Sequence, residues 1–469
     1  MPQERAEEDV QAFIDTNFAK CVIEPLSEFI KIPNVSRAYD PEWETNGLMD
    51  RACEFVIEHA KSQGVEDFSI ELIKEEGKPN IVLAIADKKD APTVLLYGHI
   101  DKQPPLTNLW REGLHPYKPV IEDGKLYGRG GADDGYAFFA SLFIVKALQK
   151  FGLQKHRFVL FFECDEESGS RDLVYFLKKN LEKIGEPSVM VCLDSGTVDY
   201  EHFSLTTSLR GMITFELKVE VTSEGLHSGQ ASGIVPDTFR IARDLLARFE
   251  DTKTGQVIPE LFVNIPKDKY EQACQLIDEV GSIDFKIPFL EGVRPVTEDP
   301  LQVYLNRTWR PQSTVIGFEG LPGPKICGSV LNPSTTYIIS CRLPPTLAHE
   351  QAAKTIEDFF AAQKPLYNAK LSFRTITEGT GLNVNPFSDK MARLLNEAAD
   401  KFYGKIPLFM GEGMSIPFLN SFQQIFPKAE FLVAGVLGPG SNAHGPNEFI
   451  DLKFAQRLTQ SFVHIFRNY

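Results

Sequence analysis

Short apolar runs alternate with helical patterns along the first 200 residues of the chain. Runs at 80–86, 93–98, 157–163 and 188–194 have the length and residue types of strands that are buried on both faces. Residues 136–150, between two of these runs, have the pattern of a helix of about four turns. The alternation predicts an α/β domain built on a mainly parallel sheet.

The pattern changes after residue 206. Residues 212–222 alternate between apolar and polar side chains, which is typical of a half-buried antiparallel strand. A helix is expected at 237–249, then an irregular, proline-bearing stretch to about 325. A strand at 336–342, a helix at 347–363 and a strand at 369–377 are expected after it. This block predicts an inserted α+β domain at 207–380.

The α/β pattern returns after the insertion, with a helix expected at 388–402 and a strand at 430–436. We therefore expect one discontinuous main domain, formed by 1–206 and 381–469, that carries the inserted domain.

Composition narrows the function classes. The chain has 469 residues, with 49 Lys and Arg against 64 Asp and Glu, and a formal net charge of −15. A field of this sign repels phosphate backbones, so nucleic acid and anionic membranes are poor partners. No apolar run approaches the ~20 residues of a membrane span.

The chain start and the cysteines indicate a cytoplasmic protein. The start, MPQERAEEDV, lacks the basic and apolar regions of a secretory signal. The seven cysteines are scattered and include no C-x-x-C pair, which favours reduced thiols. Any metal would therefore be held by histidine and carboxylate side chains.

Acidic and imidazole side chains follow three of the expected strands. The run at 93–98 leads into His99 and Asp101, the run at 157–163 into Glu166 and Glu167, and the run at 188–194 ends at Asp194. Parallel strands place these ends at one edge of the sheet, where ligands bind in open α/β folds. Asp133 and Asp134 precede the helix at 136–150 and add two more carboxylates.

So many carboxylates at one edge would repel one another, and bound divalent metal ions would neutralise their negative charge. Residues 99 and 101 face the same side of a strand, so one can bind metal while the other orients the imidazole. Of Glu166 and Glu167, one can bind metal while the other acts as a general base. Taken singly, each of these residues also fits a solvated turn, a helix start or a strand-end histidine.

Six motifs in order resemble the di-zinc metallopeptidases that include aminoacylases, carboxypeptidase G-type enzymes and carnosinases. They are GHIDKQP at 98–104, YGRGGADDG at 127–135, EESGS at 166–170, Asp194, GLHSG at 225–229 and HGPNEF at 444–449. The likeness runs from FIKIP at 29–33 to the end of the chain. With GKLYGRG at 124–130, it is closest to the carnosinase and cytosolic non-specific dipeptidase branch.

The resemblance implies that the discontinuous domain binds metal and is catalytic, and that the insertion is a dimerisation domain that acts as a lid. It also implies a role for each matching residue. Asp133 would bridge two divalent ions, zinc in the first place, although O and N ligands also suit manganese or cobalt. His99 and Asp194 would hold one ion, and Glu167 and His444 the other. The resemblance also implies a cis peptide bond after Asp133.

The reaction that the resemblance implies is hydrolysis of an amide or peptide bond in a small dipeptide-like or N-acyl amino acid substrate. Glu166 would be the general base on a metal-bridging water, and Asp101 would support His99. His227 would stabilise the oxyanion from the inserted domain of the partner subunit in a homodimer.

Substrate contacts are implied for three further residues. Arg342 would grip a free carboxylate, and Asn332 and Ser415 would contact the substrate backbone. The chain departs from the branch pattern beside these positions: Gly135 stands where lysine is usual, Gly411 where arginine is usual, and Met414 where glycine is usual.

Three functions remain open from the sequence. The leading one is a dipeptidase acting on substrates with a free carboxylate. An N-acyl-amino-acid deacylase or carbamoyl amidohydrolase on the same fold is the second. A non-catalytic dimeric binding protein is the third, and it would be expected to lack a ligand or Glu166, which this chain retains.

Overall fold

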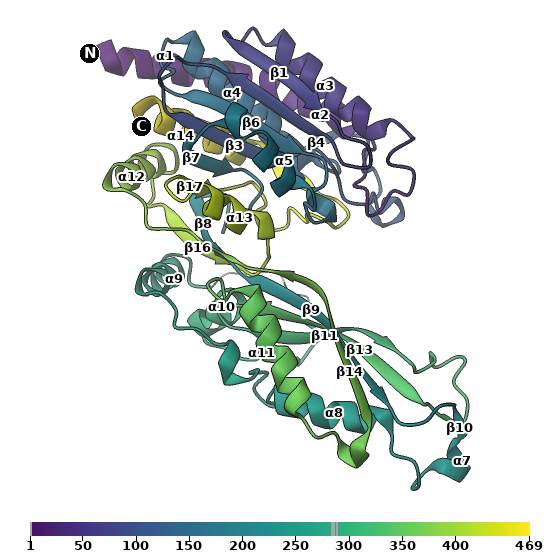
Figure 1. The fold of residues 1–469 in the computed structure, drawn as a ribbon. Coiled ribbons are helices and arrows are strands. Elements are labelled where there is room, and N and C mark those ends of the chain that lie inside the picture. The colour runs from purple at the N-terminus through teal and green to yellow at the C-terminus, as the bar shows by residue number, and fades with distance from the viewer. Residues whose placement is uncertain (1, 283–286, 288) are drawn as a thin grey trace.

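The computed structural model describes residues 2–282, 287 and 289–469. Figure 1 shows two lobes: one contains a large sheet between helices together with both chain termini, and the other contains a smaller sheet. The larger lobe, here called the catalytic lobe, is built from the two ends of the chain. The smaller lobe, here called the lid lobe, comes from the middle.

The catalytic lobe is built on a nine-stranded sheet. Its strands run in the order β1-β2-β6-β3-β7-β17-β8-β15, with β16 pairing β8. Their bounds are β1 Phe68–Ile73, β2 Ile81–Ala86, β3 Thr93–His99, β6 Arg157–Glu163, β7 Pro187–Cys192, β8 Ser204–Leu209, β15 Leu382–Asn383, β16 Leu408–Glu412 and β17 Glu430–Val433. The central strands β6, β3, β7 and β17 are parallel, while β2 joins β6 antiparallel. The prediction of a mainly parallel sheet is confirmed.

Helices cover both faces of this sheet, and its central strands are therefore buried on both sides. One face packs against α1, α2, α3, α4, α12 and α14, and the other packs against α5, α6 and α13. The helices are α1 Pro2–Phe18, α2 Glu24–Ile30, α3 Leu48–Ser62, α4 Tyr136–Lys150, α5 Leu173–Lys179, α6 Leu181–Ile184, α12 Asp389–Tyr403, α13 Pro417–Ile425 and α14 Leu452–Asn468.

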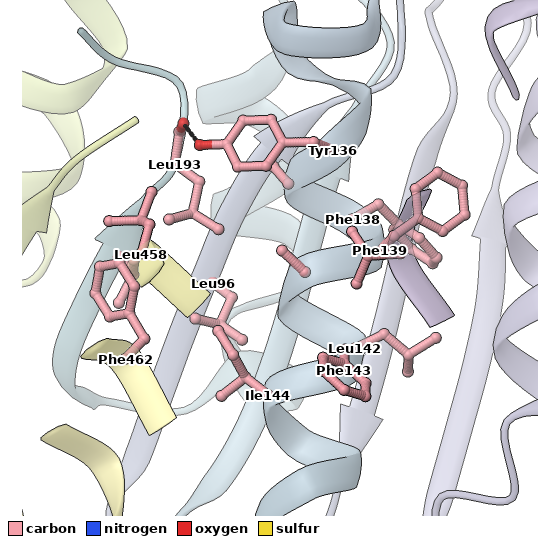
Figure 2. Close-up of a cluster of buried hydrophobic side chains, with 14 of the residues drawn as sticks. Leu96, Tyr136, Phe138, Phe139, Leu142, Phe143, Ile144, Leu193, Leu458 and Phe462 are labelled. Atoms are coloured by element: carbon pink, nitrogen blue, oxygen red, sulfur yellow. Dashed lines mark hydrogen bonds between the residues drawn. The ribbon is translucent and has the colours of Figure 1, made fainter. Parts of the chain in front are cut away.

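Helix α4 is the most deeply buried of these elements and coincides with the helix expected at 136–150. Its side chains pack with Leu96 of β3 and with Leu458 and Phe462 of α14 (Figure 2). At its first residue the Tyr136 hydroxyl donates to the carbonyl oxygen of Leu193 at 2.5 Å. The core is therefore linked directly to the residue before Asp194.

The lid lobe contains a four-stranded antiparallel sheet in the order β11-β13-β9-β14. Its strands are β9 Gly211–Glu220, β11 Gln312–Glu319, β13 Ser334–Leu343 and β14 Lys370–Gly379. Alternate side chains of β9 and β13 are buried under α8 Thr238–Phe249 and α11 His349–Ala362. The two-residue strands β10 Leu226–His227 and β12 Val330–Leu331 pair at the far end of this lobe (Figure 1).

The expectation of an irregular stretch up to residue 325 is wrong. This stretch contains α9 Lys267–Val280, α10 Pro300–Thr308 and strand β11. The side chain of Asp299 caps α10 by accepting from the Gln302 N–H at 3.1 Å, and Pro300 occupies the first turn, so this Asp-Pro pair is a helix start and not a loop signal. Tyr304 and Leu305 of α10 form a small core with Leu276 of α9 and Met410 of β16.

That small core joins part of the middle segment to the catalytic sheet. Helices α9 and α10 both contact β16, although they lie within 207–380. The exact division into 1–206 with 381–469 and 207–380 stays a prediction. Among the described residues, no helix is both long and apolar enough to cross a membrane.

Candidate active site

Three parallel strands deliver the candidate residues to one edge of the catalytic sheet. β3 ends at His99, β6 ends three residues before Glu166, and β7 ends two residues before Asp194. Because these strands are parallel, their carboxyl ends lie together, as the sequence predicted. The helical turn Gly131–Gly135, just before α4, carries Asp133 to the same edge of the sheet.

Asp133 lies between two histidines. Its Oδ1 is 3.1 Å from Nε2 of His99, and its Oδ2 is 3.1 Å from Nε2 of His444. The His99 ring is fully buried, and its Nε2 is also 3.9 Å from Oδ2 of Asp194. His444 Nε2 lies 3.2 Å from Oε2 of Glu167. The five residues expected to hold metal are thus brought together around Asp133, and the peptide bond after Asp133 is cis.

Two overlapping groups of ligand atoms have the spacing of metal sites. His99, Asp133 and Glu167 form one group, and His99, Asp134 and Asp194 form the other; the ligand atoms of each lie within 4.8 Å of one another. Asp134 was not among the assigned ligands. Its Oδ2 accepts from the backbone N–H of His99 at 3.2 Å, which also fits a role in positioning β3.

Asp101 has a wider structural role than the sequence indicated. Its carbonyl oxygen is 3.0 Å from Nδ1 of His99, and its carboxylate Oδ1 is 3.5 Å away. The carboxylate accepts from the backbone N–H groups of Glu166 and Glu167 at 3.2 and 3.1 Å. Asp101 therefore holds the loop after β6 against the end of β3.

The site carries an excess of buried negative charge. Burial, followed by repulsion from Asp133, raises the pKa of Glu167 to about 7, and burial raises that of Asp194 to about 7. Burial, followed by the charge of Asp194, holds the pKa of Glu166 well above its usual range. The hydrogen bonds to Asp133 and Glu167 outweigh burial and raise the pKa of His444 to about 11. These carboxylates are placed where cations would stabilise them.

Unsatisfied oxygens support the same interpretation. Glu167 Oε1 and Asp134 Oδ1 are buried and have no hydrogen-bond partner among the described residues. The other oxygen of Glu167 accepts from Nε2 of Gln103 at 2.5 Å. A buried acceptor without a partner costs about 1–3 kcal/mol, and a metal ion would satisfy it.

A buried ion pair, missed in the sequence, fixes the turn that carries Asp133. Arg129 Nη1 donates to Glu448 Oε2 at 2.7 Å, and both side chains are buried. Arg129 Nη2 also donates to the carbonyl oxygen of Gly445, next to His444. The pair therefore joins the segments that carry two candidate ligands. Its partners lie 319 positions apart, and only their presence in two of the motifs could have signalled it.

The expected substrate residues fall into two places. Arg342, near the end of β13, donates to the hydroxyl of Ser415 at 2.9 Å, where the lid lobe meets the segment after β16. His227 and Asn332 lie elsewhere, at the paired strands β10 and β12 at the far end of the lid lobe (Figure 1). Within one chain His227 is exposed and is not brought to the metal-site residues.

Two of the three departures have a packing reason. A Cβ at Gly135 would lie 2.5 Å from the carbonyl oxygen of Gly130 and 2.6 Å from a ring carbon of Phe29. A Cβ at Gly411 would lie 2.7 Å from the Ser208 hydroxyl, with α10 close behind it. Met414 is 44% exposed and lines a pocket beside the site.

Comparison with known proteins gives a consistent set of relatives. A cysteinylglycine-S-conjugate dipeptidase of Corynebacterium striatum is 28% identical over 370 residues, covering 77% of this chain and 78% of that protein. The Cys-Gly metallodipeptidase DUG1 of Saccharomyces cerevisiae is 26% identical over 446 residues, covering 91% of each. A Beta-Ala-His dipeptidase of Mus musculus is 26% identical over 397 residues, covering 80% of this chain and 76% of that protein.

Solved structures share the fold along nearly the whole chain. The dipeptidase Dug1p of Saccharomyces cerevisiae superposes with a TM-score of 0.74 at 22% identity, covering 99% of this chain and 98% of that one. Human carnosine dipeptidase 1 gives a TM-score of 0.74 at 19% identity, covering 98% of each. The model of Peptidase family M20/M25/M40 matches residues 95–468. The chain is a member of this peptidase family.

Proposed function

We propose that the chain is a two-metal dipeptidase that cleaves dipeptide-like substrates with a free carboxylate. The observation that carries the proposal is the arrangement of Asp133 between His99 and His444, with Glu167 and Asp194 beside the two imidazoles. The family and the dipeptidase relatives support a peptide bond as the target.

The donor set fits two divalent ions. Asp133 directs one oxygen toward each histidine and would be the ligand that the two ions share. His99 and Asp194 would hold one ion, and Glu167 and His444 the other. Oxygen and nitrogen donors of this kind suit zinc first, and manganese or cobalt as well. The buried, unpartnered Oε1 of Glu167 supports the fit.

Bound in this way, the two ions would supply Lewis-acid activation of the scissile carbonyl and of the attacking water. Glu166 takes the proton of that water and passes it to the leaving amine nitrogen. Asp101 keeps Glu166 in place through the hydrogen bond from its backbone N–H.

The oxyanion needs a donor that one chain does not bring to the metal-site residues. His227 and Asn332 lie close together because strands β10 and β12 are paired, with Leu226 opposite Leu331 and His227 opposite Val330. We assign both to the site of a partner subunit in a homodimer, where His227 donates to the oxyanion and Asn332 contacts the substrate backbone. The exposure of His227 at the end of the lid lobe supports this assignment.

Arg342 and Ser415 form the carboxylate end of the substrate site. The guanidinium offers parallel N–H donors to a carboxylate, and the Ser415 hydroxyl fixes the direction of the Arg342 side chain. The scattered, reduced cysteines support a cytoplasmic location for the enzyme.

A hydrolysis screen on metal-reconstituted protein tests the proposal. Dipeptides are compared with the matching N-acetyl amino acids, because a free α-amine separates a dipeptidase from a deacylase. The proposal expects faster cleavage of dipeptides. Preference for the acetylated series would replace it with the deacylase function. Glu166→Gln should reduce kcat by at least ~100-fold while metal content stays unchanged, and near-normal turnover of this variant would refute the general-base role.

A further inference from the structure

The segment 34–38, here called the brace segment, lies between α2 and α3 in the chain and contacts the residues that follow β3. Asn34 Nδ2 donates to the carbonyl oxygen of Ile100 at 2.8 Å, and the backbone N–H of Ser36 donates to that of Lys102 at 2.9 Å. Both carbonyl groups belong to the stretch that directly follows β3. The brace segment is therefore fixed to one of the loops that form the candidate metal site.

The same segment contacts the loop that follows β6 and carries Glu166 and Glu167. Ser36 Oγ lies 2.5 Å from Ser168 Oγ, which also accepts from the backbone N–H of Ala38 at 2.9 Å. Ser168 is the next residue after Glu167, and it lies 132 positions after Ser36 in the chain. A distant part of the sequence thus packs directly beside the two glutamates.

Arg37, in the middle of these contacts, pairs with two carboxylates of that loop. Its Nε lies 2.7 Å from Oδ1 of Asp165, and its Nη1 donates to Oδ2 of Asp172 at 3.1 Å. The side chains of Arg37, Asp165 and Asp172 are 13%, 3% and 22% exposed, so the pair with Asp165 is almost removed from water. Loss of one charge from such a pair leaves the other buried and uncompensated. Arg37 therefore joins the two ends of the loop 165–172.

Asp165 organises the turn that contains the two glutamates. Its carbonyl oxygen accepts from the backbone N–H groups of Ser168 and Ser170 at 3.1 and 2.9 Å. Its carboxylate Oδ2 accepts from the backbone N–H of Arg171 at 3.2 Å. The turn is thus held from within by Asp165, and Arg37 holds Asp165 from the brace segment.

We propose that Arg37 is a positioning residue that acts through Asp165 to fix the turn carrying Glu166 and Glu167. This inference rests on the proposed function, which gives the two glutamates their roles as general base and metal ligand. Arg37 acts by holding Asp165 and not by contact with substrate or metal. Asp172 is the outer partner that keeps the guanidinium in place.

Metal affinity is the first measurement, because it reports the position of the proposed ligand Glu167 and needs no reaction. In chelator-competition titrations with zinc, Arg37→Met and Asp165→Asn should each bind about tenfold more weakly than the wild type or worse, as expected for residues that support metal ligands. The double variant should bind within about twofold of Asp165→Asn alone, because Arg37 acts through that carboxylate. Additive losses in the double variant would overturn the proposal, and so would normal affinity in Asp165→Asn, which keeps the shape of the side chain.

Lys78→Met is the matched control. Lys78 Nζ lies 3.2 Å from Oδ1 of Asp172, the outer partner of Arg37, and its side chain is 31% exposed. Its loss removes a cation beside the same loop without changing the pair at Asp165, so zinc affinity should stay within about twofold of the wild type. A loss equal to that of Arg37→Met would assign the effect to the overall charge of the loop and overturn the proposal.

Dipeptide kinetics on the metal-saturated enzyme separate a positioning role from a general loss of stability. Arg37→Met should lower kcat about tenfold or more and leave KM within about twofold, because Glu166 handles the proton of the attacking water and does not hold the substrate. Arg37→Lys keeps the charge but not the fork of donors and should recover part of kcat. A raised KM with normal kcat in Arg37→Met would overturn the proposal.

Failure of the proposed function gives a different pattern, namely no dipeptide cleavage by the wild type at any metal loading. The zinc titrations then still decide the inference, because they need no substrate. Weaker and non-additive zinc binding in the Arg37→Met and Asp165→Asn variants would support it, and normal binding would refute it.

Discussion

Replacing Glu448 by Gln removes a buried charge without changing the shape of the side chain. The carboxylate accepts from Arg129 Nη1 at 2.7 Å and from the backbone N–H groups of Gly130, Ala132 and Asp133 at 3.1, 3.1 and 3.2 Å. A carboxamide has one acceptor oxygen, and its NH₂ group would face one or more of these donors. The turn that carries Asp133 would lose its anchor.

The cost follows from burial. Both side chains are at most 1% exposed, and loss of one charge from a buried pair costs about 3–5 kcal/mol because the other charge stays buried. Glu122→Gln is the matched control, since Glu122 pairs with Arg111 on the surface, where the side chains are 44% and 47% exposed. Loss of an exposed pair costs about 1 kcal/mol or less.

Urea unfolding of both variants measures the difference in stability directly. A chelator-competition titration of the same proteins should show metal affinity about 10–100-fold weaker in Glu448→Gln and unchanged in Glu122→Gln, because residues behind metal ligands have effects of this size. Equal stability losses in the two variants, or normal metal affinity in Glu448→Gln, would contradict the role given to the buried pair.

Three further predictions address the core, the pH dependence and the substrate site. Tyr136→Phe leaves the buried carbonyl oxygen of Leu193 without its donor and should lower the free energy of unfolding by about 1–3 kcal/mol in urea; an unchanged midpoint would argue against this link. Burial, followed by repulsion from neighbouring lysines, lowers the pKa of His156 to about 4 from an ordinary value near 6.5, so the unfolded chain binds the proton first. The stability contributed by neutral His156 is complete above pH 6.5 and is lost as pH falls toward 4, by about 2 kcal/mol at pH 5; urea midpoints of His156→Phe should therefore fall less between pH 7 and 5 than those of the wild type. Arg342→Met should raise KM about tenfold or more for dipeptides and leave KM unchanged for their C-terminal amides; equal effects on both would exclude a carboxylate contact.

The sequence is informative where local pattern and burial agree. Strands buried on both faces read as continuous apolar runs, so the bounds expected for β6 and α4 match the structure at both ends. The order of the motifs then indicated which residues meet at the sheet edge, because parallel strands bring their carboxyl ends together.

The sequence is uninformative where long-range packing decides the structure. Helices α9 and α10 were missed because their apolar faces are short and pack on β16, which lies more than 100 residues further along the chain. The pairing of Arg129 with Glu448 and the pairing of Arg37 with Asp165 depend on the same kind of distant contact. No local pattern marks such pairs.

The residues assigned to a partner subunit depend on an assembly. His227 was assigned from the order of the motifs, and Asn332 from its match to a family position that contacts substrate. A single chain holds both at the far end of the lid lobe. Their roles remain predictions, which sedimentation of the enzyme and kinetics of His227→Ala would test together. A monomer with full activity would contradict the shared site.

The central claim is that two metal ions held around Asp133 are needed for peptide hydrolysis. The most direct measurement removes metal with a chelator and follows dipeptide hydrolysis as zinc, manganese or cobalt is returned in known equivalents per chain. We expect activity to rise until two equivalents are bound and then to level off. Full activity with less than one bound ion per chain, or without metal, would contradict the claim.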